Sequence, residues 1–367
     1  MQKHCPANER IKREYLTYLK EAESNSEPTL DGTAKAIARF ETYTRHTDFK
    51  KFHIQQAVGF KQKLVTEANI KTGKLLSLAT QRSTLNSLKA FFKWLAAQSG
   101  YKSRFTYADA DYFNLSDKDN RAAQACTPRP FPSLEQVQHV VRTMPASTAI
   151  QQRDRAMIAF MILTGCRDRA LVSLKLKHID VASSRVNFDA REVKTKFSKS
   201  FVTFFMQVGD DIRAIFEDWV ATLTADHFWG PSDPLFPAPK MEINGAGGFH
   251  TAGLRREHWT TASPVRRIFR TAFEQAGLPY FHPHSFRHTL AQLGEQVCRS
   301  PEEFKAWSQN IGHEHVMTTF NSYGKVSTPR QAEIIRRLAS PAAPAQRDLA
   351  ELLRQAACAV DTQQRRD

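Results

Sequence analysis

Apolar residues recur at helical spacing throughout the first third of the chain. Between polar breaks they lie three or four positions apart, on one face of a helix. The segments with this pattern are Glu9 to Ala22, Leu30 to Tyr43, Ile54 to Ala68 and Thr80 to Ala97. No stretch there alternates convincingly between apolar and polar residues, as a half-buried strand does. The pattern predicts an all-helical first domain over residues 1–118.

A proline-rich segment follows this domain. Residues 119–132 contain prolines at alternate positions, and this spacing favours an extended, stiff connector. Ser133 then has the residue type of a helix N-cap, with Gln136 placed to complete a capping box. We therefore expect a linker over 119–132 and a second domain over 133–338.

The second domain is predicted to combine helices with a small antiparallel sheet. Arg155 to Leu163 is apolar on every side, which is typical of a helix buried in a core. Arg185 to Phe188 and Phe201 to Phe205 are strand-like and flank a lysine-rich turn, so they predict a hairpin. Ile179 to Val181 is a further short strand of the same predicted sheet.

The remainder is predicted to be loop and helix. Trp229 to Gly253 is rich in Gly and Pro, so we expect a long surface loop. Helical spacing resumes at Ser263 to Ala276 and continues, with interruptions, to Leu338. Residues 339–367 are expected to form a linker and a short helix over Asp348 to Ala357. The predicted fold class is mainly α with a small antiparallel β-sheet.

The composition indicates a polyanionic partner. The 367 residues include 52 Lys and Arg against 37 Asp and Glu, a formal net charge of +15. An excess of this size is typical of proteins that bind nucleic acid, although a solvated basic surface without a partner is the alternative. The longest apolar run, Ala156 to Leu163, is too short to span a membrane. The five cysteines are odd in number and lack CxxC spacing, which fits a reducing cytoplasm.

The helix predicted over Thr80 to Ala97 is the best candidate for contacts with a duplex. It lies in a stretch, residues 68–108, that contains no Asp or Glu. Arg82, Lys89 and Lys93 mostly share its polar face and could contact phosphates. An ordinary helix whose exposed face happens to lack acidic residues is the alternative.

Two segments of the second domain carry arginines suited to phosphate. Arg167 directly follows the turn that ends the buried helix, and its planar guanidinium fits two phosphate oxygens. A structural salt bridge of Arg167 to Asp168 or Asp180 is the alternative. His284 and Arg287 are three residues apart, on one face of the first turn of a predicted helix, where free backbone N–H groups also favour an anion.

Three further features are weaker when taken singly. Histidines at positions 282, 284 and 288 could indicate zinc, but no Glu or Cys lies close by, so we predict no metal. Lysines of the hairpin turn, Lys194, Lys196 and Lys199, could contact DNA, and one of them could protonate a leaving oxygen. A phenol such as that of Tyr323, ten residues after His313, can attack phosphorus, although a tyrosine among helices usually only packs.

Four segments, taken in order, resemble the motifs of the tyrosine recombinases, the phage-integrase family of site-specific DNA recombinases. They are TGCR, the lysine-rich hairpin, HPHSFRHT and NIGHEHVMTTFNSYGKV. The resemblance covers about residues 133–326, and the basic helical region before it is similar to the family's core-binding, SAM-like domain. It implies two domains that form a clamp around double-stranded DNA. The implied catalytic residues are Arg167, Lys194, His284, Arg287, His313 and Tyr323.

The resemblance also implies the chemistry. Tyr323 attacks with His284 as proton acceptor, and the product is a 3′-phosphotyrosyl bond formed without metal or other cofactor. Arg167 and Arg287 bind the phosphate, His313 donates a hydrogen bond to it, and Lys194 protonates the departing 5′-hydroxyl. Lys196 is the alternative to Lys194, because this hairpin is a residue longer than is common.

Two positions depart from the family pattern. The acidic residue often found three positions after the first arginine is Ala170 here, which puts support of the site by that carboxylate in question, with Asp168 near. The spacing from His313 to Tyr323 is one residue longer than in many relatives.

Family resemblance further implies four protomers acting on two duplexes through a four-way junction. We expect a cytoplasmic enzyme, associated with the nucleoid when bound to DNA, and an accessory directionality factor is a further candidate partner. The C-terminal segment could pack on a neighbouring protomer or fold back on its own. Three alternatives stay open: a type IB topoisomerase, a DNA-binding relative without catalysis, and a metal-dependent nuclease, which the lack of clustered carboxylates disfavours.

Overall fold

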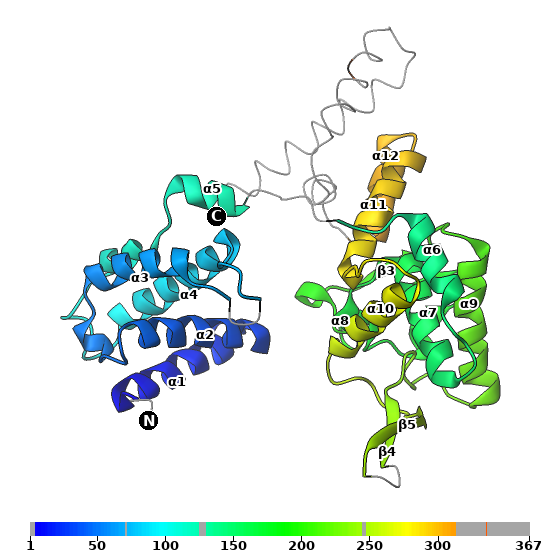
Figure 1. The fold of residues 1–367 in the computed structure, drawn as a ribbon, viewed down its shortest axis with the longest axis horizontal. Helices are drawn as coiled ribbons and strands as arrows, with labels where there is room; N and C mark the ends of the chain where they lie inside the picture. Colours follow the sequence, from blue (N-terminus) through cyan, green and yellow to red (C-terminus); the bar gives the residue numbers. More distant parts are fainter. Residues whose placement is uncertain (1–3, 70–71, 125–129, 244–246, 313–334, 336–367) are drawn as a thin grey trace. The chain divides into compact units, whose positions relative to one another are not determined.

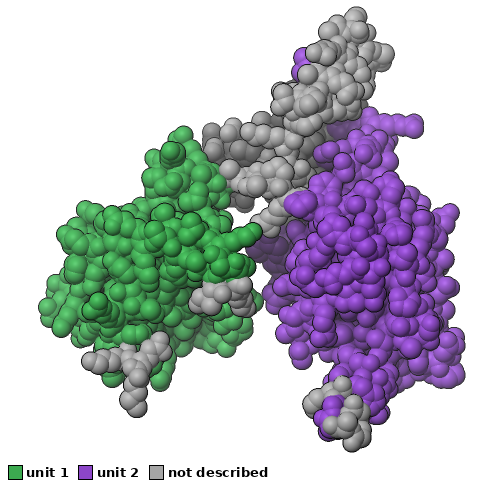
Figure 2. Space-filling view, viewed as in Figure 1, with its two compact units in different colours: residues 1–126 green, residues 127–367 purple. Residues whose placement is uncertain are grey.

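The chain divides into two compact units, residues 1–126 and 127–367. The computed structural model describes residues 4–69, 72–124, 130–243, 247–312 and Ile335. Figures 1 and 2 show the two units in ribbon and space-filling views. The division falls within the segment that the sequence predicts as a linker, and the predicted boundaries themselves remain expectations.

The first unit is helical in its described residues. Its elements are α1 (Pro6–Glu21), α2 (Glu27–Tyr43), η1 (Phe49–Lys51), α3 (Ile54–Thr66), α4 (Leu78–Ala96), η2 (Ala108–Phe113) and α5 (Asp117–Gln124). The first four α-helices agree with the apolar spacing, and Ser77 caps α4 by accepting a hydrogen bond from the backbone N–H of Thr80. Helix α5 occupies the start of the predicted linker, so that part is helical instead of extended.

Aromatic rings fill the core of this unit. Phe40 of α2 is buried, and its ring centroid lies 5.2 Å from that of Phe60, 5.4 Å from that of Phe92 and 5.5 Å from that of Phe113. These contacts are edge-to-face, the arrangement that aromatic quadrupoles favour. The core therefore joins α2, α3, α4 and η2 around one aromatic cluster.

The second unit is built around one buried helix. Its helical elements are α6 (Leu134–Thr143), α7 (Ala149–Thr164), α8 (Asp168–Leu171), η3 (Leu176–His178), η4 (Lys196–Ser198), α9 (Asp210–Ala221), η5 (Thr222–Asp226), α10 (Ser263–Gln275), η6 (Pro283–Ser285), α11 (Phe286–Val297) and α12 (Pro301–Asn310). Every residue of α7 from Ala156 to Thr164 is buried, as its apolar sequence predicts. Helices α6, α9 and α11 pack on it.

Two small antiparallel sheets complete this unit. The first has the order β1 (Ile179–Asp180), β2 (Arg185–Phe188), β3 (Phe201–Phe204), and pairs Phe188 with Phe201 next to the turn. The predicted hairpin is thus present. The expectation of a long surface loop over 229–253 was wrong, because β4 (Pro239–Ile243) pairs there with β5 (Phe249–Leu254).

The missed hairpin has a physical explanation. Strand β4 is exposed at nearly every position, so it has no buried face to impose an apolar alternation on the sequence. Its pairing is carried by the backbone ladder, with Ile243 opposite Phe249. In Figure 1 the hairpin extends away from the helices of its unit. Among the described helices of both units, none is long and apolar enough to cross a membrane.

Candidate active site

A tight turn after α7 positions Arg167. Gly165 ends the helix in the left-handed conformation, with φ of 61°, and its N–H bonds to the carbonyl of Met161. A Cβ at Gly165 would lie 3.0 Å from Leu290 Cδ1 and 3.2 Å from Ile311 Cγ2, so both the conformation and the packing require glycine. Arg167 follows in an extended conformation as the N-cap residue of α8.

The second arginine is tied directly to this turn. Arg287 lies in the first turn of α11 and is only 2% exposed. Its Nη1 donates a hydrogen bond of 2.6 Å to the carbonyl oxygen of Gly165, 122 positions earlier. The two arginine segments, which the sequence treats as separate, are therefore held together by a buried charge-assisted hydrogen bond.

Arg167, Arg287 and Lys196 line one cleft in the second unit. The other lining residues include Thr195, Phe201 and Ile311, so the cleft joins the turn after α7, helix α11 and the lysine hairpin. Of the predicted cations, the structure thus brings Lys196 to the two arginines. Three positive side chains around one concave surface are suited to a phosphodiester.

Lys194 lies elsewhere on the same turn. Its backbone N–H donates a hydrogen bond of 2.9 Å to Ser173 Oγ, and it is not among the described residues that line the cleft. Burial lowers the pKa of His258, its hydrogen bond to the carbonyl of Val172 opposes this effect, and the charges of Lys175 and Lys194 add to the lowering. Lys199, the third predicted lysine of the turn, has its Nζ 5.8 Å from the ring centroid of Phe197.

A carboxylate that the sequence reasoning did not single out fastens the hairpin to η3. Glu192 accepts hydrogen bonds of 2.8 Å from Lys175 Nζ and 2.7 Å from Lys177 Nζ. These two ammonium groups lower the pKa of Glu192 to about 2. Across the turn, Ser200 Oγ accepts a hydrogen bond from the backbone N–H of Ala190. The turn that carries Lys196 is thus held by Glu192 on one side and by the Ala190–Ser200 hydrogen bond across its ends. These contacts are visible only in the three-dimensional structure.

His284 stands beside the arginines as a neutral base. It is part of η6, and its side chain reaches solvent. Dense surrounding protein, followed by the charges of Arg287 and Arg167, lowers its imidazole pKa to about 4. At neutral pH the group is therefore unprotonated and able to accept a proton. By contrast, burial raises the pKa of the nearby Cys166 thiol to about 12, so this cysteine is not a nucleophile.

The acids near Arg167 bind other arginines. Asp168 Oδ2 accepts from Nη2 of Arg266 at 3.1 Å, and Asp180 Oδ2 lies 3.5 Å from Nη2 of Arg185. Ala170, at the position where relatives often carry an acid, is buried and lines the cleft. The carboxylate of Asp168 is thus engaged with α10 through Arg266.

His313 and Tyr323 lie outside the described residues. The described chain reaches Gly312, which has φ of 73° and whose Cβ position would be 3.0 Å from Phe201 Cε2. Ile311, just before it, lines the cleft. The described chain therefore lines the cleft up to two positions before His313. The predicted C-terminal helix over residues 348–357 also lies outside the described part.

The lysines predicted to grip a duplex are engaged within the first unit. Lys89 Nζ lies 2.9 Å and Lys93 Nζ 3.2 Å from Oδ1 of Asp111, which belongs to η2. Lys89 Nζ also donates a hydrogen bond of 2.9 Å to Asn114 Oδ1. Arg82 is half-buried, with its Nε enclosed. The stretch without acids in the sequence therefore meets an acid in space, and this acid neutralises part of its charge.

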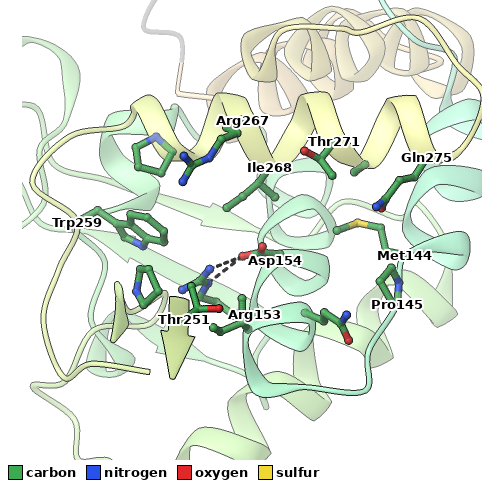
Figure 3. Close-up of a pocket in the computed structure, with 15 residues that line it drawn as sticks. Met144, Pro145, Arg153, Asp154, Thr251, Trp259, Arg267, Ile268, Thr271 and Gln275 are labelled. Carbon is green, nitrogen blue, oxygen red and sulfur yellow. Dashed lines mark hydrogen bonds and ion pairs between the residues drawn. The ribbon is translucent and has the colours of Figure 1, made fainter. Parts of the chain in front are cut away.

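Figure 3 shows a second cavity of the second unit, with a volume of about 310 Å³. Its wall includes the buried Arg153, whose Nε and Nη2 donate hydrogen bonds of 2.9 and 2.7 Å to Asp154 Oδ1. Arg153 also lies over the ring of Trp259, 4.8 Å from its centroid. Burial raises the pKa of Asp154, although Arg153 opposes the effect. None of the predicted catalytic residues lines this cavity.

In the described part of the chain, no three His, Cys, Asp or Glu side chains are grouped as metal ligands. The backbone N–H of His284 donates to Nδ1 of His282 at 3.2 Å. The rings of His284 and His288 meet edge to face with centroids 6.2 Å apart. His284 thus contacts the two other histidines, one through its backbone N–H and one through its ring.

Known proteins resemble this chain in sequence. A model of the phage integrase family matches residues 133–330. Tyrosine recombinase XerC of Anoxybacillus flavithermus is 25% identical over 306 residues, which are 83% of this chain and 89% of the relative. XerC of Escherichia coli O157:H7 is 24% identical over 249 residues, 67% of this chain and 70% of the relative.

Solved structures share the fold. A XerH site-specific recombinase bound to palindromic difH substrate has a TM-score of 0.58, with 17% identity over 90% of this chain and 85% of that one. A lambda integrase (75–356) dimer bound to a COC′ core site has a TM-score of 0.57, with 15% identity over 87% of this chain and 99% of that one. Because the family model covers more than half of the sequence, the chain belongs to the phage integrase family of tyrosine recombinases, enzymes that cleave and rejoin DNA at specific sites.

Proposed function

We propose that the chain recombines two double-stranded DNA sites through a 3′-phosphotyrosyl bond on Tyr323 and a four-way junction. The observation that carries this proposal is the cleft shared by Arg167, Arg287 and Lys196. These three cationic residues line the same small cleft, and we propose that the scissile phosphodiester binds against it. Such fixed charges stabilise the pentacoordinate transition state without a metal ion.

The phenol oxygen of Tyr323 attacks phosphorus, its proton passes to His284, and the bond from phosphorus to the 5′-oxygen breaks. The low pKa of His284 supports this role, because a neutral imidazole is available at neutral pH and a phosphate beside it would strengthen its basicity. His313 donates a hydrogen bond to a phosphate oxygen. Rejoining is the reverse step, with the 5′-hydroxyl of the partner strand as nucleophile.

We assign protonation of the departing 5′-oxygen to Lys196 in preference to Lys194. Lys196 lines the cleft with both arginines, and Lys194 is not among the described residues that line it. Lys194 nevertheless has a structural role, since its backbone N–H is bonded to the buried Ser173. Lys199 is proposed to contact a neighbouring phosphate from the same turn.

Assembly and location are proposed by analogy with the relatives. The lambda integrase structure is a DNA-bound dimer, and the XerH structure holds its DNA substrate after cleavage. We propose four copies of this chain on two duplexes, an accessory factor that sets direction, and a cytoplasmic location on the nucleoid. Strand exchange between two sites is the activity that separates a recombinase from a type IB topoisomerase or an inactive DNA-binding relative.

The test is covalent trapping on nicked duplexes drawn from a random-sequence library. The nick lets the short 5′-hydroxyl fragment diffuse away, so cleavage leaves a protein–DNA complex that resists SDS. We expect the full-length protein to form this complex in EDTA, and Tyr323→Phe to bind DNA without forming it. An SDS-resistant complex with Tyr323→Phe would show that another residue is the nucleophile, and loss of activity in EDTA would revive the metal-dependent alternative.

A second arm tests the lysine assignment. Replacing the bridging 5′-oxygen by sulfur gives a leaving group that needs no proton. We expect Lys196→Ala to cleave ordinary DNA slowly and the sulfur-substituted DNA at the rate of the unchanged protein. Lys194→Ala is the matched control from the same turn. It should cleave ordinary DNA and sulfur-substituted DNA each at the rate of the unchanged protein. Rescue of Lys194→Ala instead would reverse the assignment.

A further inference from the structure

The turn between β2 and β3 exposes an aromatic ring on an unfavourable backbone. Phe197 has φ of 59° and ψ of 26°, in the left-handed region that bulky residues seldom adopt. Its side chain is 75% exposed. Glycine would occupy this backbone without strain and would leave no apolar surface in water. Neither local conformation nor burial therefore explains a phenylalanine here.

The ring lies between two lysines. Lys196 Nζ is 4.7 Å from its centroid and Lys199 Nζ is 5.8 Å away, both within cation–π range. Lys196 also lines the cleft with Arg167 and Arg287. The exposed ring is thus carried on the same short 3-10 turn as the cation assigned to the leaving oxygen. A polyanion that engages these lysines would bring its own surface against the ring.

We propose that Phe197 stacks on a DNA base beside the cleaved phosphate and thereby positions Lys196. Apolar side chains that enter the minor groove can part a base step, and aromatic rings bind unstacked bases irrespective of their identity. The phosphates on either side would meet Lys196 and Lys199. The contact rests on the proposed function, because it needs the scissile phosphate in the cleft. Phe197 is a positioning residue in this scheme and takes no part in bond making.

A second phenylalanine of the same unit provides a matched control. Phe228 also has a left-handed backbone, with φ of 54°, and is 80% exposed. It belongs to the segment after η5 and does not line the cleft. Phe228→Gly and Phe197→Gly therefore relieve the same kind of backbone strain, and each removes one exposed phenyl ring. Only Phe197→Gly removes a ring beside Lys196.

The experiment measures cleavage and base stacking with the full-length protein. Nicked duplexes carry 2-aminopurine, whose fluorescence rises when it leaves the helical stack, at the base next to the cleaved phosphate. We expect the unchanged protein and Phe228→Gly to raise this fluorescence and to form the SDS-resistant complex at equal rates. Phe197→Gly should abolish the rise and slow complex formation about tenfold, as loss of one base–aromatic contact would. Phe197→Trp should retain both signals.

A third substrate distinguishes stacking from a general effect on the hairpin. When the same base is replaced by an abasic site, the unchanged protein should form the covalent complex as slowly as Phe197→Gly does on the intact duplex. The rate of Phe197→Gly itself should fall little further on the abasic duplex. If Phe197→Gly matches the unchanged protein in fluorescence and rate, or if base removal and ring removal are additive, the proposal is wrong. Failure of the unchanged protein to form any covalent complex would instead contradict the proposed function, while the fluorescence comparison would still report on Phe197.

Discussion

Replacing Gly165 by alanine should destabilise the second unit by an amount that its surroundings allow us to estimate. The residue has φ of 61°, and a left-handed backbone costs an L-residue about 1–2 kcal/mol. The added Cβ would also lie 3.0 Å from Leu290 and 3.2 Å from Ile311, and such overpacking costs about 1–3 kcal/mol. The expected loss in free energy of unfolding is therefore about 2–5 kcal/mol.

A matched glycine separates the two contributions. Gly277 has φ of 70° and follows α10, but nothing lies within 4 Å of its Cβ position. Gly277→Ala should cost only the backbone part, about 1–2 kcal/mol. Gly32, inside α2 and equally open, is a control for the opposite sign, since alanine there should stabilise the first unit by about 0.5–1 kcal/mol.

Urea unfolding of the full-length chain measures these values. Tryptophan fluorescence follows mainly the second unit, which contains four of the five tryptophans, whereas Trp94 is in the first. Gly165→Ala should shift the transition of the second unit and also slow DNA cleavage, because the Gly165 carbonyl anchors Arg287. If Gly165→Ala loses no more free energy of unfolding than Gly277→Ala, then Leu290 and Ile311 do not crowd the added Cβ in solution. That result would refute the expected packing cost.

Three shorter predictions rest on other contacts. Asp154→Ala should cost about 3–5 kcal/mol in urea unfolding, because Arg153 is 2% exposed and would stay charged without its carboxylate; a loss below 1 kcal/mol would contradict this. Asp111→Asn should release the two lysines it binds, so duplex binding should strengthen across sequences and its salt dependence should steepen; unchanged binding would place DNA on another face. The low folded-state pKa of His284, about 4 against an ordinary 6.5, means that its contribution to stability is full above pH 6.5 and is lost as the pH falls toward 4. His284→Gln should therefore flatten the fall in urea midpoint between pH 7 and 5, and an equally steep fall would assign that dependence to other groups.

Helical periodicity and the order of the motif residues could be predicted from the sequence because both are local properties of the chain. The apolar spacing predicted α1 to α4, and the unbroken apolar run of α7 predicted its burial. A helix buries a face set by neighbours three and four positions away, so the pattern is written in consecutive residues. The ordered arginine, lysine, histidine and tyrosine segments likewise indicated the phage integrase family, to which the chain belongs.

Contacts between residues far apart in the sequence could not be predicted in this way. Asp111 neutralises α4 although the helix lies in a stretch without acids, because charge acts through space. The β4–β5 hairpin left no apolar alternation because β4 buries almost nothing. Glu192 gave no signal either, since its two lysine partners lie 15 and 17 positions away in another element.

The sequence by itself determined the family, the helical framework and the residue types that chemistry on a phosphodiester requires. Only the tertiary structure decided which of them meet. Arg287 bonds to a carbonyl 122 positions earlier, and Lys196, from a turn whose backbone is left-handed at Phe197, lines the same cleft. Residue identity supplies charge and basicity, but their direction in space comes from backbone conformation and packing over the whole unit.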